Sequence, residues 1–231
     1  MKRVIGLLSG ILLLFAITGT SNAALIDRGG GLIYDSDQNI TWLQDANLAA
    51  TNTFDVSGIY SGGYMSWNTA EAWIAAMNMA NYKGYHDWRL PATVDGPYVF
   101  GYDGTTTAGY NITTSEMGYM YYVNLGNLGH YATDGTNPQP GWGLNNTSPF
   151  NNLQSDVYWS GTEYSAYPDN AWLFVFGFGD QGHVSKAGAA CAWVVRPGDV
   201  SAVPIPGAVW LLGSGLACLG AYRRKLARRH R

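Results

Sequence analysis

The sequence predicts an α+β domain flanked by two apolar segments. Two helical patterns occur in the first part of residues 24–200, and a period-two alternation of apolar and polar residues replaces them from residue 156 onwards. Early helices followed by antiparallel strands are typical of α+β domains. The abundance of Gly, Tyr, Trp, Asn and Thr, with few Lys and Glu, favours a loop-rich fold with an aromatic core over a helical bundle.

Residues 1–23 have the three parts of a secretory signal peptide. Lys2 and Arg3 precede the apolar run VIGLLSGILLLFAI, and the small residues SNA at positions 21–23 offer a cleavage site. This run is shorter than the roughly 20 residues that a membrane span needs. We therefore expect export and cleavage before Ala24, with an uncleaved anchor as the alternative.

The body of the chain, residues 24–200, is long enough for one domain with a substantial core. It contains five basic residues and all 16 acidic residues of the chain, which gives a net charge of −11. Nucleic-acid binding requires basic side chains over phosphates, so this balance argues against a nucleic-acid partner.

Residue patterns that carry catalysis, metals or cofactors are missing from the body. Its three histidines are far apart in the sequence, which disfavours a zinc site. The spacing Asp35-x-Asp37-x-Asn39 is similar to the start of a calcium loop but lacks the required Gly and Glu, so it is interpreted as a hairpin turn. Cys191, the single cysteine of the body, is expected to be a small buried strand residue. We therefore expect a non-enzymatic protein without a metal or cofactor.

Local patterns place the first elements. The string GGLIYDSDQNITWLQD predicts strand, turn and strand. The string SWNTAEAWIAAMNMANYKG predicts a helix, in which Asn68 is the cap and Glu71 completes a capping box. The apolar residues of this helix fall on one face, which we expect to be buried; they are Ala70, Trp73, Ile74 and Met77.

The remaining elements follow from the same signals. A second helix is expected in TTSEMGYMYYVNLGNLG, with Thr114 or Ser115 as its cap and Gly126 near its end. Residues 92–112 and 130–152 are expected to be long loops. The strings VYWSGTEY, AWLFVFGFG and HVSKA predict three strands, with GDQG as the turn between the second and third, and AACAWVVRPG predicts the last strand.

Three strings carry a resemblance to a known family. They are GYHDWRLPA at 84–92, VYWSGTEYS at 157–165 and AWVVRPG at 192–198. In this order they resemble the Lcl C-terminal domain family, over about residues 28–198. The resemblance implies a C-type-lectin-like fold, in which two helices and a small antiparallel sheet support long loops, related to the domain of formylglycine-generating enzymes. The calcium signature of sugar-binding lectins and the cysteine pair of oxidising relatives are absent from this sequence.

We expect the residues of these strings to be mostly scaffold. Asp87 and Arg89 can pair with each other or bond the backbone where the chain leaves the first helix, and Pro91 prevents that helix from continuing. Trp88 and Trp159 are expected to anchor the core. The scaffold residues are Asp87, Trp88, Arg89, Leu90, Pro91, Tyr158, Trp159, Ser160, Glu163 and Arg196.

Aromatic residues in the long loops are the candidates for a binding surface. Aromatic side chains add contact area at a low entropy cost, which suits binding loops. The sequence also allows the alternative that these residues fill the thin core of a loop-rich domain. The candidates are Tyr98, Tyr102, Tyr110, Tyr131 and Trp142.

Residues 201–231 resemble a sorting signal. The 21 residues from Ala202 to Tyr222 carry no charge, and as a helix they would span about 31 Å, enough to cross a bilayer. The six basic residues that follow are expected to stay in the cytoplasm. The string VPIPGAVWLLGSGLACLG and the basic end resemble the Val-Pro-Leu-Pro-Ala variant of PEP-CTERM signals. The matching residues include Val203, Pro204, Pro206, Trp210, Arg223 and Arg224.

This second resemblance implies recognition by an exosortase, cleavage near the Pro-x-Pro box and delivery to the cell surface or extracellular matrix. The membrane would be a transient partner, through the C-terminal helix before cleavage. We therefore expect an exported surface or matrix protein whose binding domain serves adhesion or exopolysaccharide and biofilm association, with a polysaccharide or a surface ligand as partner. The alternative is an envelope enzyme related to the formylglycine-generating fold.

Overall fold

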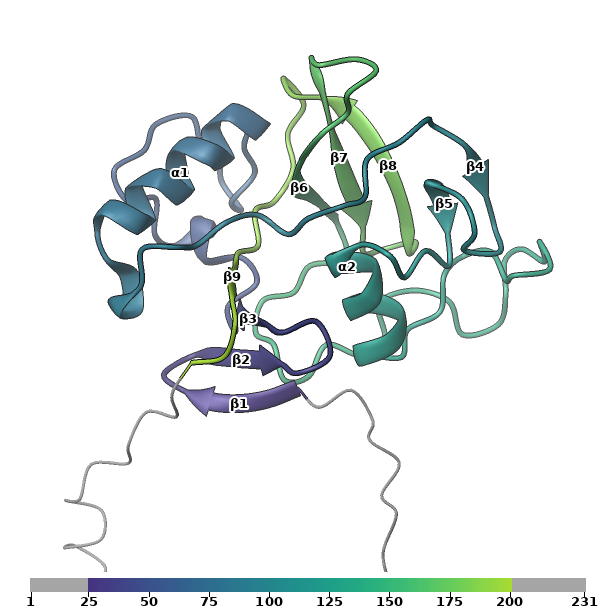
Figure 1. The fold of residues 1–231 in the computed structure, drawn as a ribbon, viewed down its shortest axis with the longest axis horizontal. Helices are drawn as coiled ribbons and strands as arrows, with labels where there is room; N and C mark the ends of the chain where they lie inside the picture. Colours follow the sequence, from purple (N-terminus) through teal and green to yellow (C-terminus); the bar gives the residue numbers. More distant parts are fainter. Residues whose placement is uncertain (1–24, 201–231) are drawn as a thin grey trace, which may run out of the picture.

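The computed structural model describes residues 25–200, which form two β-sheets and two helices (Figure 1). The expected signal peptide at 1–23 and the expected sorting signal at 201–231 lie outside the described residues. Within residues 25–200, no helix is long and apolar enough to cross a membrane. The α+β class is confirmed, with two sheets in place of one small sheet.

The first sheet joins the beginning of the domain to its end. Its strands are β1 (Leu25–Gly29), β2 (Leu32–Asp35), β3 (Ile40–Leu43) and β9 (Val195–Pro197), in the order β1-β2-β3-β9 and all antiparallel. The expected strand, turn and strand correspond to β2 and β3, whereas β1 was not expected. Only the last part of AACAWVVRPG is a strand, and it pairs with β3, which places the last strand of the domain beside one of the first (Figure 1).

The turn between β2 and β3 is held by a buried carboxylate, as the hairpin interpretation predicts. Asp35 Oδ1 accepts hydrogen bonds from the backbone N–H groups of Asp37 and Gln38, both at 3.1 Å. Asn39 then adopts a left-handed conformation with φ of 51°, which Asn tolerates better than most residues. The Asp35 carboxylate thus serves the backbone of the turn.

Helix α1 (Trp67–Met79) buries the predicted face but begins earlier than predicted. Its N-cap is Ser66, whose hydroxyl accepts the N–H of Thr69 at 3.2 Å, so the prediction of Asn68 as the cap is wrong. Ser66 has an extended backbone, and Asn68 already lies inside the helix. The expected apolar residues are all buried, because the 3.6-residue period depends on the spacing and not on the cap.

Helix α2 (Glu116–Tyr119) is short and continues as the π-helical turn η3 (Met120–Asn124). Ser115 caps it by accepting the N–H of Gly118 at 3.1 Å, which agrees with one of the two predicted caps. Gly126 follows with a φ of 63°, the left-handed conformation that commonly ends a helix. Two short 3-10 turns, η1 (Leu48–Ala50) and η2 (Tyr82–Gly84), precede and follow α1.

The second sheet has the order β4-β5-β8-β7-β6. The late strands β6 (Val157–Glu163), β7 (Asn170–Val175) and β8 (Asp180–Ser185) are antiparallel neighbours, as predicted. The turn between β7 and β8 occupies residues 176–179, earlier than the predicted GDQG, because Asp180 already pairs with Val175.

Two further strands extend this sheet from a region predicted to be loop. They are β4 (Phe100–Gly101) and β5 (Ala108–Tyr110), which pair in parallel with each other, and β5 pairs with β8. The prediction of one continuous loop over residues 92–112 is therefore wrong from residue 100 onwards. Both strands are too short to give a recognisable period.

The core is built from tryptophans, as the composition predicts. Trp88 and Trp159 are buried, which confirms them as core anchors. Trp42 and Trp193 pack with their ring centroids 4.3 Å apart, between the first sheet and the chain that leads into β9. The five largest fully buried side chains are Trp42, Trp73, Trp159, Trp172 and Trp193.

Candidate binding site

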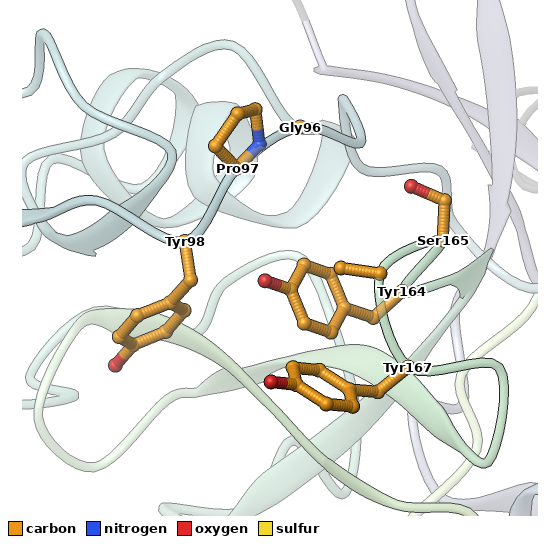
Figure 2. Close-up of a pocket in the computed structure, with 7 residues that line it drawn as sticks. Gly96, Pro97, Tyr98, Tyr164, Ser165 and Tyr167 are labelled. Atoms are coloured by element: carbon orange, nitrogen blue, oxygen red, sulfur yellow. The ribbon is translucent and has the colours of Figure 1, made fainter.

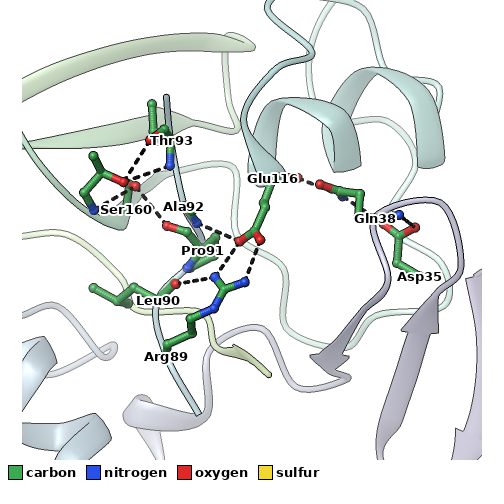
Figure 3. A network of polar contacts seen from close by, with 10 residues as sticks. Asp35, Gln38, Arg89, Leu90, Pro91, Ala92, Thr93, Glu116 and Ser160 are labelled. Carbon is green, nitrogen blue, oxygen red and sulfur yellow. Dashed lines mark hydrogen bonds and ion pairs between the residues drawn. The ribbon is translucent and has the colours of Figure 1, made fainter. Parts of the chain in front are cut away.

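The three strings that carry the family resemblance meet in space and form one scaffold. Arg89 and Val195 exchange two backbone hydrogen bonds of 2.9 Å. The Ser160 hydroxyl donates to the Pro91 carbonyl at 2.9 Å (Figure 3). The N–H of Gly161 donates to the same oxygen at 2.8 Å. The chain from Arg89 to Pro91 is therefore fixed between β9 and β6.

The charged residues of this scaffold agree with one of the two predicted alternatives, because Arg89 Nη1 donates to the backbone carbonyl of Leu90 at 3.0 Å. Asp87 pairs with Arg196 at 2.9 Å, and the guanidinium holds the pKa of the Asp87 carboxyl below its ordinary value. Arg89 instead makes two bonds of 2.7 Å to the Glu116 carboxylate, which also accepts the N–H of Ala92 at 2.7 Å (Figure 3). Asp87 and Arg89 do not pair, because β9 brings Arg196 to one and α2 brings Glu116 to the other.

The chain beyond Ala92 is held against β6, β7 and the connection between them. Thr162 accepts the N–H of Thr93 and donates its hydroxyl to the Thr93 carbonyl, both at 3.0 Å. The indole N–H of Trp172 donates to Asp95 Oδ1 at 2.8 Å. Hydrogen bonds from Ser165 and Trp172 lower the pKa of Asp95, so this carboxylate is ionised at neutral pH.

These contacts leave an open groove between two loops. One side is formed by residues 96–98 and the other by residues 164–167, and the cavity measures about 470 Å³. We call it the tyrosine groove, because Tyr98, Tyr164 and Tyr167 line it. Figure 2 shows the hydroxyl groups of Tyr164 and Tyr167 directed toward the side on which Tyr98 lies.

A ring stack supports the groove from β8. The imidazole of His183 stacks on Tyr164, with centroids 4.0 Å apart and planes 17° apart, and meets Tyr98 edge-on at 4.9 Å. Burial lowers the pKa of His183, so the ring is neutral at pH 7. Asn170 Nδ2 lies 3.0 Å from His183 Nδ1, which fixes the ring plane. The groove therefore presents aromatic surface that is already positioned.

The five predicted loop aromatics are divided between three places. Tyr98 is exposed in the tyrosine groove. Tyr102 stacks on Tyr131, with centroids 4.6 Å apart and planes at 12°, and Tyr131 also contacts Tyr110 at 4.7 Å. Trp142 is exposed and stacks on Phe178 at 5.3 Å. Tyr110 lies on β5 and is buried, so the prediction that it belongs to a binding loop is wrong.

Tyr98 was identified from the sequence as a candidate binding residue, whereas Tyr164 and Tyr167, which form the other side of the tyrosine groove, were not. Tyr164 follows directly on the alternating pattern of β6 and was assigned to that strand, although it lies just beyond its end. Tyr167 lies in the connection YSAYPDN, whose Pro, Asp and Asn indicate a turn. A tyrosine in a predicted turn is the sequence signal from which Tyr167 could have been proposed as a binding residue. The contribution of His183 could not be inferred, because it depends on the pairing of β7 with β8.

Cys191 is placed unfavourably for nucleophilic catalysis. Cys191 is fully buried, and burial raises the pKa of its thiol to about 12, which leaves little thiolate at neutral pH. Among residues 25–200, no group of three or more His, Cys, Asp or Glu side chains is arranged to hold a metal ion.

Comparison with known proteins gives one family assignment. No curated protein matches the chain. The family model of the Lcl C-terminal domain matches residues 31–196, which include α1, α2, the whole second sheet, and the first sheet apart from β1 and Pro197. This range contains the first two strings and ends within the third, and the predicted sorting segment at 201–231 lies beyond it. The chain belongs to the Lcl C-terminal domain family.

Proposed function

We propose that this protein is a non-enzymatic surface or extracellular-matrix protein whose lectin-like domain binds polysaccharide in the tyrosine groove. The observation that carries this proposal is the convergence of three tyrosines from two separate loops on one open cavity. The C–H faces of sugar rings pack against aromatic rings, whose faces are electron-rich. The tyrosine hydroxyls can donate to and accept from sugar hydroxyls at the same time.

The charge distribution supports an uncharged polysaccharide as the ligand. None of the five basic residues of the body lines the groove. Four of them pair with carboxylates, and Lys83 donates to the Gly30 carbonyl. With a net charge of −11 over residues 24–200, long-range electrostatics repel anionic chains.

The tyrosine groove is tested by affinity electrophoresis in gels that contain neutral, amine-bearing or anionic polysaccharides. We expect a neutral polymer to retard the protein and Tyr167→Ala to abolish the retardation. Tyr60→Ala is the matched control, because Tyr60 is 65% exposed and Tyr167 is 64% exposed, and Tyr60 lies outside the groove. Equal retardation of the two variants, or no retardation by any polymer, would contradict the proposal.

Delivery to the surface is proposed from the two terminal segments. The signal-peptide pattern at 1–23 and the Pro-x-Pro box with its apolar and basic segments support export, a transient membrane stage and cleavage by an exosortase. Mass spectrometry of the mature protein in each cell fraction tests this part. We expect a surface or matrix form that lacks the residues after the box. Retention of the tail in the inner membrane of cells with an active exosortase would refute it.

The environment of Cys191 supports the non-enzymatic part of the proposal. The competing function, an envelope enzyme related to the formylglycine-generating fold, needs a reactive cysteine or a metal. A thiol that is fully buried, with a pKa raised to about 12, is poorly suited to act as a nucleophile. Loss of a measured enzymatic activity in Cys191→Ser would favour the enzyme instead.

A further inference from the structure

A second hollow adjoins the tyrosine groove along the chain. It measures about 350 Å³ and is formed by the residues of β4, the connection that follows it, and residues 133–135. We call it the second pocket. Phe100 and Tyr102 give it an aromatic wall, with ring centroids 5.6 Å apart, and they are 48% and 39% exposed. Tyr102 is supported from behind by its stack with Tyr131.

The rest of the second pocket is polar. Its lining includes three threonines and the carboxylates of Asp103 and Asp134. Asp103 accepts the N–H and the hydroxyl of Thr105 through Oδ1, and Asp134 accepts the N–H of Thr136 through Oδ1. These hydrogen bonds lower the pKa of both aspartates, so both are ionised at neutral pH. An aromatic wall combined with hydroxyl and carboxylate acceptors suits a sugar ring with hydroxyl groups and disfavours an anionic one.

The groove and the second pocket share one continuous segment. Tyr98 lines the groove and Phe100 lines the second pocket, so their Cα atoms lie at most about 7 Å apart. Thr107 fixes the segment between them, because its hydroxyl oxygen accepts the N–H of Val99 at 3.0 Å and donates to the Pro97 carbonyl. Along the chain, Val99 alone separates the tyrosine groove from the second pocket.

We propose, on the basis of the proposed function, that the tyrosine groove and the second pocket bind successive parts of one uncharged polysaccharide chain. The protein would then recognise a polymer and bind short oligosaccharides weakly. Each part alone is open to solvent, whereas a chain held in the groove presents its next sugars to the second pocket at a high effective concentration. Such coupling raises affinity without any new contact in the groove.

The test is calorimetric titration of the full-length protein with β-1,4-linked N-acetylglucosamine oligomers of two, four and six sugars as uncharged probes. We expect the six-sugar oligomer to bind at least about tenfold more tightly than the two-sugar oligomer. Tyr102→Ala should abolish this gain and leave the affinity for two sugars unchanged. Phe100→Ala should have the same effect, and it serves as a second variant because removal of Phe100 leaves the Tyr102–Tyr131 stack in place. Tyr60→Ala should behave like the unmodified protein.

Equal affinity for the two lengths would overturn the inference and leave the proposed function standing. An equal loss for both lengths in Tyr102→Ala and Phe100→Ala would also overturn it. If no saccharide bound in this titration and no polysaccharide retarded the protein in the gels, the proposed function itself would be rejected.

Discussion

Replacing Glu116 by Gln tests whether the segment that leads to the groove depends on one carboxylate. The two oxygens of Glu116 accept two bonds of 2.7 Å from Arg89, and one of them also accepts the N–H of Ala92 at 2.7 Å. In Glu116→Gln, an amide NH₂ replaces one acceptor oxygen with almost no change of shape. A donor then faces a donor: one of the three bonds is lost if the NH₂ takes the place of Oε1, and two are lost if it takes the place of Oε2.

The expected cost lies between two limits. Hydrogen bonds to charged groups contribute about 1.5–3 kcal/mol, whereas exposed ion pairs contribute about 0–1 kcal/mol. The Glu116 side chain is 17% exposed and the Arg89 side chain is 37% exposed, so solvent screens the pair in part. We therefore expect Glu116→Gln to lower the free energy of unfolding by about 1–2 kcal/mol.

Urea unfolding followed by tryptophan fluorescence measures this loss, because five of the tryptophans are fully buried. Glu163→Gln is the control. It breaks the 2.8 Å pair with Lys186, in which Glu163 is 53% exposed, and should cost less than about 1 kcal/mol. Arg89→Lys should cost an amount similar to Glu116→Gln, because an ammonium cannot make both bonds. Equal losses in Glu116→Gln and Glu163→Gln would refute the reasoning.

Three further predictions concern buried or constrained groups. Burial raises the pKa of Asp180 to about 6 from its ordinary 3.8. The folded protein therefore binds this proton more tightly than the unfolded chain does. As the pH rises from about 4 to about 6, the loss of this proton lowers the stability of the folded state. Urea unfolding should therefore show that Asp180→Asn raises the free energy of unfolding by about 1–3 kcal/mol at pH 7 and by little at pH 4. Cys191 should resist iodoacetamide at pH 8 in the folded protein and react fully in denaturant, as measured by mass spectrometry. Gly109→Ala should lower the melting temperature, because Gly109 has a φ of 101° and a Cβ there would lie 2.1 Å from the Gly101 carbonyl oxygen.

Features that depend on neighbouring residues could be predicted from the sequence. The buried face of α1, the Ser115 cap of α2 and the Asp35 turn each rest on a spacing of a few residues, and the structure contains all of them. The cap of α1 was misplaced because Ser66 and Asn68 are both good cap residues, and only the Ser66 backbone is extended.

Features that depend on long-range pairing could not be predicted. The sequence of β9 indicates a strand but does not say that its partner is β3, more than 150 residues earlier. The partners of Asp87 and Arg89 follow from that pairing and from the position of α2. The tyrosine groove requires Tyr98 and Tyr167 to approach each other from two connections, and each connection alone reads as ordinary loop.

The family motif and the groove are connected through the backbone. Ser160 and Gly161 hold Pro91, Thr162 holds Thr93, and the segment thus fixed continues directly into Tyr98. The motif residues therefore position one wall of the groove without lining most of it. A substitution in the motif, such as Ser160→Ala, should lower stability and saccharide affinity together. Tyr167→Ala should lower affinity alone, since this side chain is 64% exposed. The scaffold formed by the motif residues can accordingly present a different ligand surface when the residues of the two groove loops, 96–98 and 164–167, are changed.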